Sequence, residues 1–541
     1  MRRKYNYTYP LMVGLLIALG MFIGARFNPG VEPGKYKKPS AKLEDAWKYI
    51  TGSYVDTLNE EEMAEEAIRG MLEHLDPHSA YIPAKDLQEI NEPLEGNFEG
   101  IGIEFNILND TIVVVSPIAG GPSEALGIRA GDKIIKIENT SVAGEEISNE
   151  DVIGKLRGNK GTQVNITIYR PSAREEIEYK ITRDKIPIYS VDASYMAAPS
   201  VGYIKISRFS RTTLAEFDDA MKELKGKGME SLILDLRGNP GGYLNAAINL
   251  ADEFLPEDKL VVYTEGRAKP RQTYNATSKG SFELGKLTVL IDEGSASASE
   301  IVSGAVQDWD RAVIIGRRSF GKGLVQEPYL FADGSGMRLT VARYYTPAGR
   351  SIQKPYSHGI ESYQDELERR FEHGEFTNPD SIVFADSLKY TTSGGRTVFG
   401  GGGIMPDVFV PLDTSDNTSY LAEVVGKGLV NQYALNYSDR NRQQLEENYS
   451  TLDEFISGFE LTEAIMNDFT RFASAEDVEF NLSQYELSKD VLKAQIKALI
   501  ARQYWRNEGF YKVINRQNKA YNEAIKIIQK DDFRALGIRE N

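Results

Sequence analysis

Residues 231–242 read SLILDLRGNPGG, and this stretch decides the fold. Its apolar start has the composition of a strand buried on both faces, and the glycines after it end the strand before a helix near 244–254. Similar apolar strands alternate with helical stretches on both sides of it, which predicts an α/β core. The other expected strands are 201–206, 260–264, 287–292 and 312–316, and the other expected helices lie near 213–225 and 297–308.

A further strand follows this alternation at 337–347, MRLTVARYYTP. We expect it to pair with the strand before it across the turn at 332–336. Asp333-Gly334 in that turn is a strong hairpin signal, because such a pair accepts the positive φ angles of a tight turn.

The length of 541 residues is too great for one ordinary domain. Between 94 and 171 the pattern changes to short strands and turns. Strands are expected there at 100–107, 111–118, 132–137 and 163–170, and a short helix within 122–132. Residues 42–75 have helical spacing. The predicted regions are a leader at 1–27, a helical region at 40–90, a β-rich module at 94–171, the α/β core at 187–412 and a mostly helical extension at 413–541.

One helix of the extension has a clear apolar stripe. We expect this stripe to pack on its own domain, although a contact with a second copy of the chain is the alternative. The stripe consists of Leu487, Val491, Leu492, Ile496, Leu499 and Ile500.

Composition excludes several kinds of site. The formal net charge is −16, which argues against general binding to nucleic-acid backbones. The chain contains no cysteine, so disulfides, thiolate zinc sites and a cysteine nucleophile are excluded. No metal or organic cofactor is implied by any motif.

The N-terminus has the pattern of an export signal. Arg2, Arg3 and Lys4 precede an apolar run at 11–25, and a polar linker follows at 28–41. The run fits a signal peptide, but no clean cleavage site follows it, so an uncleaved membrane anchor is the alternative. A buried N-terminal helix is a third reading. In the first two cases the body of the protein is exported, and we expect it on the periplasmic side of a bacterial inner membrane.

Ser297 in GSASASE, 294–300, is a candidate nucleophile. It follows an apolar strand and opens a helix, so the N–H of Ala298 lies where free donors and the helix dipole favour a developing oxyanion. The alternative is structural, because Ser297 with Glu300 fits a helix capping box. The chain has only four histidines, and none is close to this stretch in sequence.

Lys322 could replace a histidine as the base. It lies between two glycines after the strand at 312–316. If a strand resumes there, Lys322, Leu324 and Gln326 share one face. Burial would lower the pKa of the amine, and an amide such as Gln326 could hold it without adding charge. The alternative is a solvated lysine in a turn.

The glycines of LDLRGNPGG, 234–242, could supply the second half of an oxyanion hole, because they let the backbone approach a substrate carbonyl. A simple strand–helix turn is the alternative. This loop, Ser297 and Lys322 all follow strands, and open α/β sheets place their sites at the carboxyl ends of strands.

Several motifs together resemble the carboxy-terminal processing peptidases, the tail-specific serine proteases of the S41 family. The resemblance covers roughly residues 40–412. It rests on LDLRGNPGG (234–242), GSASASEIVSGAVQDWDRAVIIGRRSFGKGLVQ (294–326), GGGGIMPDVFVP (400–411), YYTPAGRSIQ (344–353) and LDPHSAY (75–81).

The resemblance implies a role for each candidate. Ser297 is the nucleophile, Lys322 the general base and Gln326 the group that orients the lysine. The N–H groups of Gly242 and Ala298 form the oxyanion hole. Glu300 is then a helix-start residue rather than an acid catalyst.

The resemblance also implies that 94–171 is a PDZ domain inserted before an α/β peptidase core. Successive N–H groups of a glycine-rich loop can hold a terminal carboxylate, and the next strand edge can pair with an extended peptide. The implied function is a serine endopeptidase that processes or degrades exported proteins from their C-terminal tails. The implied tail-binding residues are Phe98, Gly100, Ile101, Gly102 and Ile103.

Three other readings are open. The first is an anchored PDZ scaffold with an inactive peptidase fold, although the intact Ser297, Lys322 and Gln326 argue against it. GRRSFGKG, 316–323, is one residue short of a phosphate-binding P-loop, which should run into a helix. His78 could belong to a histidine triad, although a structural role fits DPHS better.

The expected partners are substrates with free C-termini, together with a homo-oligomer or an adaptor, and not nucleic acid. The extension receives no chemical role.

Overall fold

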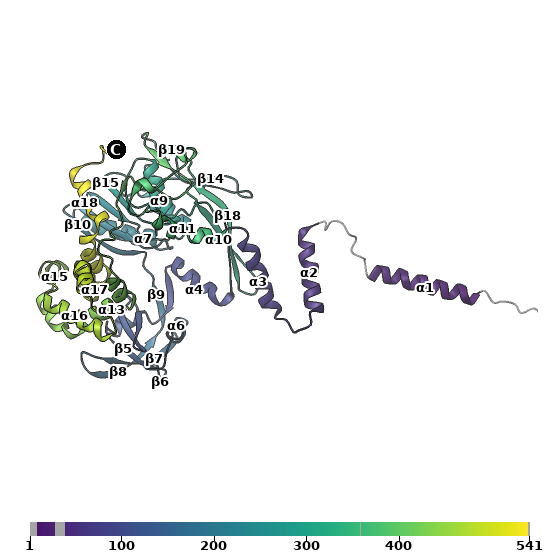
Figure 1. Cartoon of the computed structure of the whole chain (residues 1–541), viewed down its shortest axis with the longest axis horizontal. Helices are drawn as coiled ribbons and strands as arrows, with labels where there is room; N and C mark the ends of the chain where they lie inside the picture. The colour runs from purple at the N-terminus through teal and green to yellow at the C-terminus, as the bar shows by residue number, and fades with distance from the viewer. Residues whose placement is uncertain (1–7, 28–37, 358, 539–541) are drawn as a thin grey trace, which may run out of the picture. The chain divides into compact units, whose positions relative to one another are not determined.

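The computed structural model describes residues 8–27, 38–357 and 359–538 (Figure 1). The basic start of the predicted leader and most of the predicted linker lie outside the described residues. The chain divides near residue 71 into a small N-terminal unit and a large unit that holds all the sheets. The multidomain α/β fold class predicted from the sequence is confirmed.

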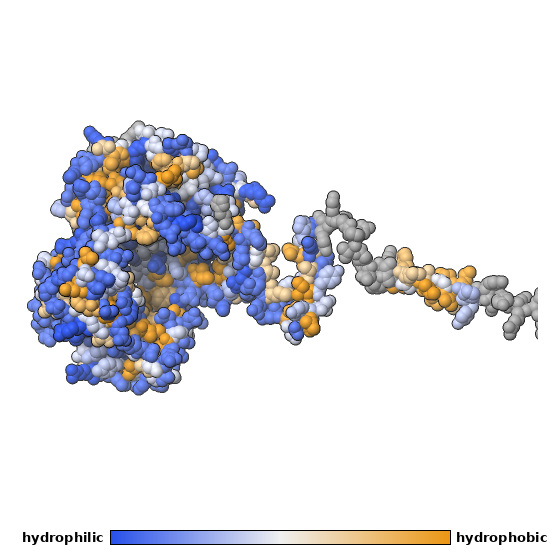
Figure 2. Space-filling view, viewed as in Figure 1, coloured by the Kyte–Doolittle hydropathy of each residue, from blue (hydrophilic) through white to orange (hydrophobic). Residues whose placement is uncertain are grey.

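The N-terminal unit is helical. Helix α1 spans Thr8–Phe27, α2 spans Pro39–Ser53 and α3 spans Glu60–Glu73. The predicted helical stretch at 42–75 is therefore two helices, because Tyr54 is extended and ends α2. Apolar side chains are exposed along α1 (Figure 2). Among the described residues, no helix combines the length and the apolarity needed to cross a bilayer.

The β-rich module contains one main sheet in the order β3-β4-β5-β7-β8, with β6 beside β5. Strand β3 is at the edge, and no described strand pairs with its outer side. Strand β8 pairs with β7 along its whole length, so the sheet extends past the predicted boundary at 171. The elements are β3 (Ile103–Leu108), β4 (Thr111–Pro117), α5 (Pro122–Ala125), β5 (Lys133–Ile137), β6 (Thr140–Ser141), α6 (Asn149–Leu156), β7 (Gln163–Arg170) and β8 (Glu175–Thr182).

A two-stranded ribbon joins this module to the core. Strand β2, Asn97–Gly100, enters the module and pairs antiparallel with β9, Asp184–Pro187, which leaves it. Helix α4, Ala84–Glu95, precedes the ribbon and ends at Gly96, whose φ of +77° is accessible to glycine.

The α/β core has the sheet order β10-β11-β12-β15-β16-β21, parallel except for β10. Apolar side chains of α7, α8 and α9 cover one face of this sheet. The strands are β10 (Val191–Ala198), β11 (Val201–Ile206), β12 (Ser231–Asp235), β15 (Lys286–Ile291), β16 (Val313–Gly316) and β21 (Val408–Phe409), and the helices are α7 (Thr213–Gly226), α8 (Leu244–Asp252) and α9 (Ala298–Asp308).

The other face is covered by the last helix of the chain, α18, Lys519–Lys530. Its Tyr521, Ala524 and Ile527 pack in one cluster with side chains of the central strands. Both faces of the sheet are therefore covered, as an α/β sheet requires, but the second cover comes from the extension.

Replacing Ile527 with alanine tests this cover. The side chain is 3 % exposed, and we expect the free energy of unfolding to fall by about 2–5 kcal/mol. Denaturant unfolding of the full chain measures the change. Gln529→Ala on the exposed side of α18 is the control, and an equal loss in both variants would contradict a packing role for Ile527.

A second, antiparallel sheet lies beside the core. Its order is β1-β18-β13-β14, with β17 also paired to β18. The predicted pairing across Asp333-Gly334 is confirmed, and Gly334 has a φ of +89°. The strand predicted at 260–264 for the α/β core belongs here instead. The elements are β1 (Ala80–Ile82), β13 (Leu260–Glu265), β14 (Gln272–Asn275), β17 (Leu324–Leu330) and β18 (Gly336–Tyr345).

Short elements occupy 360–399 between this sheet and β21. They are α10 (Ile360–Gln364), α11 (Glu366–Glu372), the 3₁₀ turns η1 (Pro379–Ser381) and η2 (Asp386–Leu388), β19 (Lys389–Thr391) and β20 (Thr397–Phe399). Strands β19 and β20 form a hairpin of their own.

The extension is helical, as predicted, and has its own apolar core. Leu492, Ile496 and Ile500 of the predicted stripe are buried in that core, whereas Leu487 is exposed. Packing within the domain is therefore confirmed for most of the stripe. Its elements are α12 (Ser419–Gly426), α13 (Leu429–Arg440), α14 (Arg442–Asn448), α15 (Leu452–Gly458), α16 (Glu463–Ala475), α17 (Leu482–Ile514), η3 (Asn515–Gln517) and α18.

Helix α17 contacts the β-rich module and then the core (Figure 1). Arg502 donates to both carboxylate oxygens of Glu104 on β3, at 3.0 and 2.9 Å. The helix is kinked at Trp505 and Arg506, and Arg506 pairs with Glu124. Beyond the kink, Asn515 in η3 contacts the core.

Candidate active site

Ser297 occupies a sharp turn between β15 and α9. Its φ and ψ are 53° and −109°, a region that residues other than glycine rarely adopt. Strained backbone of this kind persists where the surroundings fix it, and often at functional sites. A Cβ atom at Gly241 would lie 2.8 Å from Ser297 Cβ, so only glycine fits beside the turn.

Glu300 holds this turn to the loop that carries Lys322. Its carboxylate is fully buried and accepts four hydrogen bonds. One oxygen accepts from the N–H groups of Ser297 and Lys322, at 2.8 and 2.9 Å. The other accepts from the Ser319 hydroxyl and the Gly321 N–H, at 2.5 and 2.7 Å. Burial raises the pKa of Glu300 to about 7, against the effect of these hydrogen bonds.

Tyr344 on β18 makes a second link between the same two residues. Its hydroxyl lies 3.0 Å from the Ser297 carbonyl oxygen and also within hydrogen-bond distance of the Lys322 carbonyl. Ser297 and Lys322 therefore share one partner for their N–H groups and another for their carbonyls. This places the two residues side by side, although 25 positions separate them in the chain.

The Lys322 amine is partly buried and held by Gln326. Its Nζ donates to Gln326 Oε1 at 3.3 Å, and the Gln326 amide nitrogen donates to the His78 carbonyl. Burial lowers the pKa of Lys322, and the Arg338 charge lowers it further. A larger fraction of the amine is therefore neutral at a given pH. Within the described side chains, no hydrogen bond joins the Ser297 hydroxyl to this amine. Such contacts are often longer without substrate.

The predicted contact between the Lys322 and Gln326 side chains forms, but it does not arise from the predicted alternation along a strand. Strand β17 begins at Leu324, after the lysine, and its register with β18 shifts between Val325 and Gln326. The side-chain contact therefore depends on a turn and a bulge rather than on simple alternation. Residues 316–323 run into this strand and not into a helix, so the P-loop reading is wrong.

The N–H groups of Gly242 and Ala298 donate to no other residue in the described ranges. By contrast, the Gly241 N–H is taken up by the Asn239 side chain at 2.8 Å. Gly242 has a φ of +151°, and a Cβ there would lie 1.9 Å from the Phe209 carbonyl oxygen. Asn239 joins the loop to the nucleophile turn, because its carbonyl accepts from the Ala296 N–H at 3.0 Å. Two free donors thus flank Ser297.

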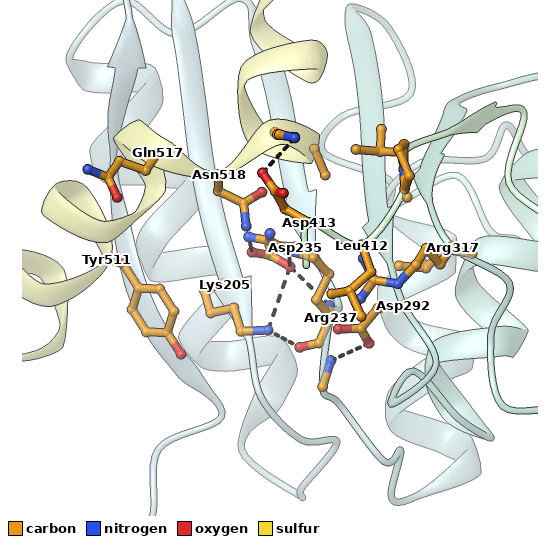
Figure 3. Close-up of a pocket in the computed structure, with 17 residues that line it drawn as sticks. Lys205, Asp235, Arg237, Asp292, Arg317, Leu412, Asp413, Tyr511, Gln517 and Asn518 are labelled. Atoms are coloured by element: carbon orange, nitrogen blue, oxygen red, sulfur yellow. Dashed lines mark hydrogen bonds and ion pairs between the residues drawn. The ribbon is translucent and has the colours of Figure 1, made fainter. Parts of the chain in front are cut away.

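A charged cluster supports these loops from behind. Asp292 accepts the N–H groups of Gly238 and Gly294 at 2.7 and 3.0 Å, which ties the glycine loop to the nucleophile turn. Arg237 donates twice to the buried Asp235 and reaches Asn515 of the extension at 3.2 Å. Asp235, Arg237 and Asp292 line a cavity of about 440 Å³ at the carboxyl ends of the parallel strands (Figure 3).

The loop for which the sequence predicts tail binding lies between β2 and β3. Ile101 and Gly102 connect β2 to the edge strand β3, and their N–H groups donate to no other residue in the part of the chain described. The Ile101 carbonyl is fixed by Ser123, which donates through its N–H at 3.1 Å and its hydroxyl at 2.6 Å. Gly100 ends β2 and Ile103 begins β3. Phe98 lies on the ribbon, where the Arg157 guanidinium stacks over its ring at 5.1 Å.

Sequence reasoning missed three groups that hold this site together. The sequence indicates only a helix start for Glu300 and a strand position for Tyr344, and it indicates no contact for the His78 segment. All three act through contacts between distant parts of the chain. The His78 ring bonds to Tyr363, at 2.8 Å, and this contact does not favour a histidine triad.

Comparison with known families matches four regions. The model of peptidase family S41 matches residues 200–362, and a PDZ domain model matches residues 100–181. The model described as the activating protease CtpB N-terminal domain matches 30–86. A family of unknown function matches 420–507, within the extension.

Curated relatives agree with these matches. Carboxy-terminal processing protease CtpB of Bacillus subtilis is 37 % identical over 322 residues, which are 59 % of this chain and 66 % of that protein. A carboxy-terminal-processing protease of Bartonella bacilliformis is 36 % identical over 353 residues, which are 63 % of this chain and 79 % of that protein. The chain thus spans between about two thirds and four fifths of their lengths.

A solved structure, that of a photosystem II D1 C-terminal processing protease, is 31 % identical. The match covers 57 % of this chain and 89 % of that one, with a TM-score of 0.34. The sequence matches place an S41 peptidase region and a PDZ domain in one chain, in the order predicted. The chain therefore belongs to the carboxy-terminal processing serine proteases of peptidase family S41.

Proposed function

We propose that this chain is a serine endopeptidase with a Ser297–Lys322 dyad. The observation that carries the proposal is the double link between the two residues, through Glu300 and Tyr344. Burial of the Glu300 carboxylate and the Tyr344 hydroxyl costs free energy. The strained backbone of Ser297, which they hold beside the partly buried lysine, costs more. An inactive scaffold would have no use for this arrangement, nor for the two free N–H donors.

The chemistry is acyl transfer. The neutral Lys322 amine takes the proton of the Ser297 hydroxyl as its oxygen attacks a peptide carbonyl carbon. The N–H groups of Gly242 and Ala298 hold the resulting oxyanion. The Lys322 ammonium then gives its proton to the leaving amine as the C–N bond breaks, and an acyl-enzyme remains. Lys322 next takes a proton from water as the water oxygen attacks the ester carbonyl carbon. The Lys322 ammonium returns this proton to the Ser297 oxygen as the ester C–O bond breaks, which frees the serine hydroxyl and the neutral amine.

Degradation of an unfolded protein with a free apolar C-terminus, by the full chain and by Ser297→Ala, tests the proposal. We expect fragments from the wild type only. Equal fragment formation by both chains would contradict the dyad. If neither chain cleaves but both bind the tail, the scaffold reading replaces the peptidase reading.

We also propose that the PDZ domain binds the substrate's C-terminal tail. The N–H groups of Ile101 and Gly102 would donate to the terminal carboxylate, and the open edge of β3 would pair with the preceding residues. Both features lie in one continuous stretch, 101–108, so a single extended peptide can use both.

A matched pair of substrates tests tail recognition. A peptide with a free C-terminal carboxylate should be processed about 10- to 100-fold faster at low concentration than the same peptide ending in an amide, because loss of the charge removes charge-assisted hydrogen bonds. The ratio of kcat/KM values measures the effect. The prediction fails if the two rates agree. An internal cleavage assay on an unrelated short peptide controls for the state of the catalytic site.

Export is proposed on the N-terminal pattern alone. The basic start and the apolar run at 11–25 support an exported enzyme, either released or anchored. Fractionation of cells that produce the full chain, with N-terminal sequencing of the mature protein, distinguishes cleavage from anchoring.

A further inference from the structure

The segment 76–79 lies against the catalytic base, and the proposed mechanism gives it no role. The Asp76 carboxylate fixes its shape by accepting the N–H groups of His78 and Ser79, at 2.9 and 3.0 Å. Thr340 on β18 holds it in place, donating its hydroxyl to Asp76 and its N–H to the Ser79 hydroxyl, both at 3.0 Å. The segment is therefore a rigid turn attached to the strand that faces β17.

His78 makes two contacts from this turn. Its carbonyl accepts the Gln326 amide, and Gln326 in turn accepts from the Lys322 amine. Its ring Nε2 lies 2.8 Å from the Tyr363 hydroxyl, and the two rings meet edge to face at 5.2 Å. One residue thus connects the support of the catalytic base to helix α10.

Tyr363 is itself firmly held, so it can act as an anchor. It is 4 % exposed, and the buried Lys354 ammonium lies 4.2 Å from the centre of its ring. The Lys354 N–H donates to the Gly321 carbonyl, next to Lys322, at 2.9 Å. The anchor and the catalytic loop are therefore parts of one packed assembly.

The charges around His78 favour a neutral ring. Burial and the Lys322 charge lower the pKa of His78 to about 4, with Lys354 acting in the same direction and Asp76 opposing it. A neutral ring can share a hydrogen bond with Tyr363 without placing a second cation beside the amine.

We propose that His78 is a positioning residue for the catalytic base: its ring, held by Tyr363, fixes the carbonyl that orients Gln326 and, through Gln326, the Lys322 amine. This rests on the proposed Ser297–Lys322 dyad. Lys322 must approach the Ser297 hydroxyl in one orientation, and a displacement of about 1 Å at such a site can cost about 100-fold in rate. His78 does not touch substrate in this scheme.

Two substitutions of similar polarity separate this role from simple packing. His78→Gln carries a polar atom at the reach of Nε2, so it can still bond to Tyr363. His78→Asn is shorter and cannot. Tyr363→Phe removes the same hydrogen bond from the other side while keeping the ring.

We expect His78→Gln to retain kcat within about threefold, whereas His78→Asn and Tyr363→Phe lower kcat about 10- to 100-fold with little change in KM. In both deficient variants the acid limb of the kcat/KM profile should move to higher pH. The reason is that burial is the main cause of the lowered Lys322 pKa. Loss of the His78–Tyr363 hydrogen bond lets water reach the amine, and this raises its pKa.

A second measurement does not depend on turnover. In the Ser297→Ala background, ¹³C NMR of labelled lysines follows the Lys322 titration, with Lys322→Ala to assign the signal. His78→Asn should raise that pKa and His78→Gln should not. Equal titrations in all three chains, or equal losses of kcat in both His78 variants without a shift of the pH limb, would overturn the proposal. Absence of Ser297-dependent cleavage in the wild type would overturn the dyad instead.

Discussion

Lys322→Ala is expected to lower kcat/KM by about 10⁴- to 10⁶-fold while leaving the fold intact. The reason is that the described structure offers no other base at Ser297: Glu300 is engaged by four donors, and the His78 ring is turned to Tyr363. The amine is partly buried and makes one side-chain hydrogen bond, so its removal costs the fold little. Cleavage of an unfolded protein with a free apolar C-terminus measures the loss.

Lys322→Arg separates the base from the charge. Arginine cannot lose its proton in a protein, so this variant should be as inactive as Lys322→Ala, although it keeps a cation at the site. Lys279→Ala, an exposed lysine elsewhere in the catalytic domain, is the control and should retain full activity. Substantial turnover by the arginine variant would show that Lys322 acts as a positive charge and not as a base.

The dyad also predicts a pH dependence with a definite sign. Only the neutral amine can take a proton, so activity should rise with pH through the Lys322 pKa. Burial lowers that pKa below the ordinary lysine value, so the rise comes at a lower pH than a solvated lysine would give. Glu300 adds a second titration in the same direction.

The candidate catalytic residues can be identified in the sequence because they lie in short local patterns. Ser297 opens a helix after a buried strand, and Lys322 and Gln326 are only four residues apart, although their contact depends on a turn and a bulge rather than on strand alternation. The glycine loop was found for the same reason. A turn beside a strained serine tolerates no side chain, and that demand is visible as consecutive glycines.

The sequence could not predict the supports, because each one is a long-range contact. Glu300 has the spacing of a helix cap, and nothing local shows that it also reaches Ser319 and Gly321. His78 reaches Gln326 from 248 positions away. The strand at 260–265 has a buried composition that fits either sheet, and its pairing with β18 decides between them. The cover on the second face of the core, α18, is likewise more than 200 residues from the strands it covers.

Glu300→Gln is expected to lower kcat/KM by about 100- to 1,000-fold, although it changes only one atom. The amide nitrogen must replace one of two carboxylate oxygens, and each oxygen accepts from two buried donors. Whichever oxygen the amide nitrogen replaces, two buried donors then face that nitrogen, which is itself a donor. Each donor left without an acceptor costs about 1–3 kcal/mol. The donors that lose their acceptor are either the N–H groups of Ser297 and Lys322, or the Ser319 hydroxyl and the Gly321 N–H in the loop just before the lysine. Glu230→Gln, at an exposed site, is the control.

The Glu300 carboxylate should make the free energy of unfolding depend on pH, and Glu300→Gln should remove that dependence. Burial raises the folded pKa of Glu300 to about 7 from an ordinary value of 4.5, so the folded chain binds the proton more readily than the unfolded chain. The stability contributed by this proton is complete below pH 4.5 and is lost as pH rises through 7, a change of about 3 kcal/mol. Denaturant unfolding of wild type and Glu300→Gln at pH 5 and pH 8 measures the difference in slope.

Activity and stability should therefore move in opposite directions around pH 7. A protonated Glu300 carries a hydrogen on one oxygen and meets the same conflict of donors as the glutamine variant, so the catalytic loops are best ordered when the carboxylate is charged. A charged, fully buried carboxylate is also the less stable folded form. If the unfolding free energies of wild type and Glu300→Gln show the same pH slope, Glu300 does not titrate in this range, and the acid limb of activity belongs to Lys322 alone.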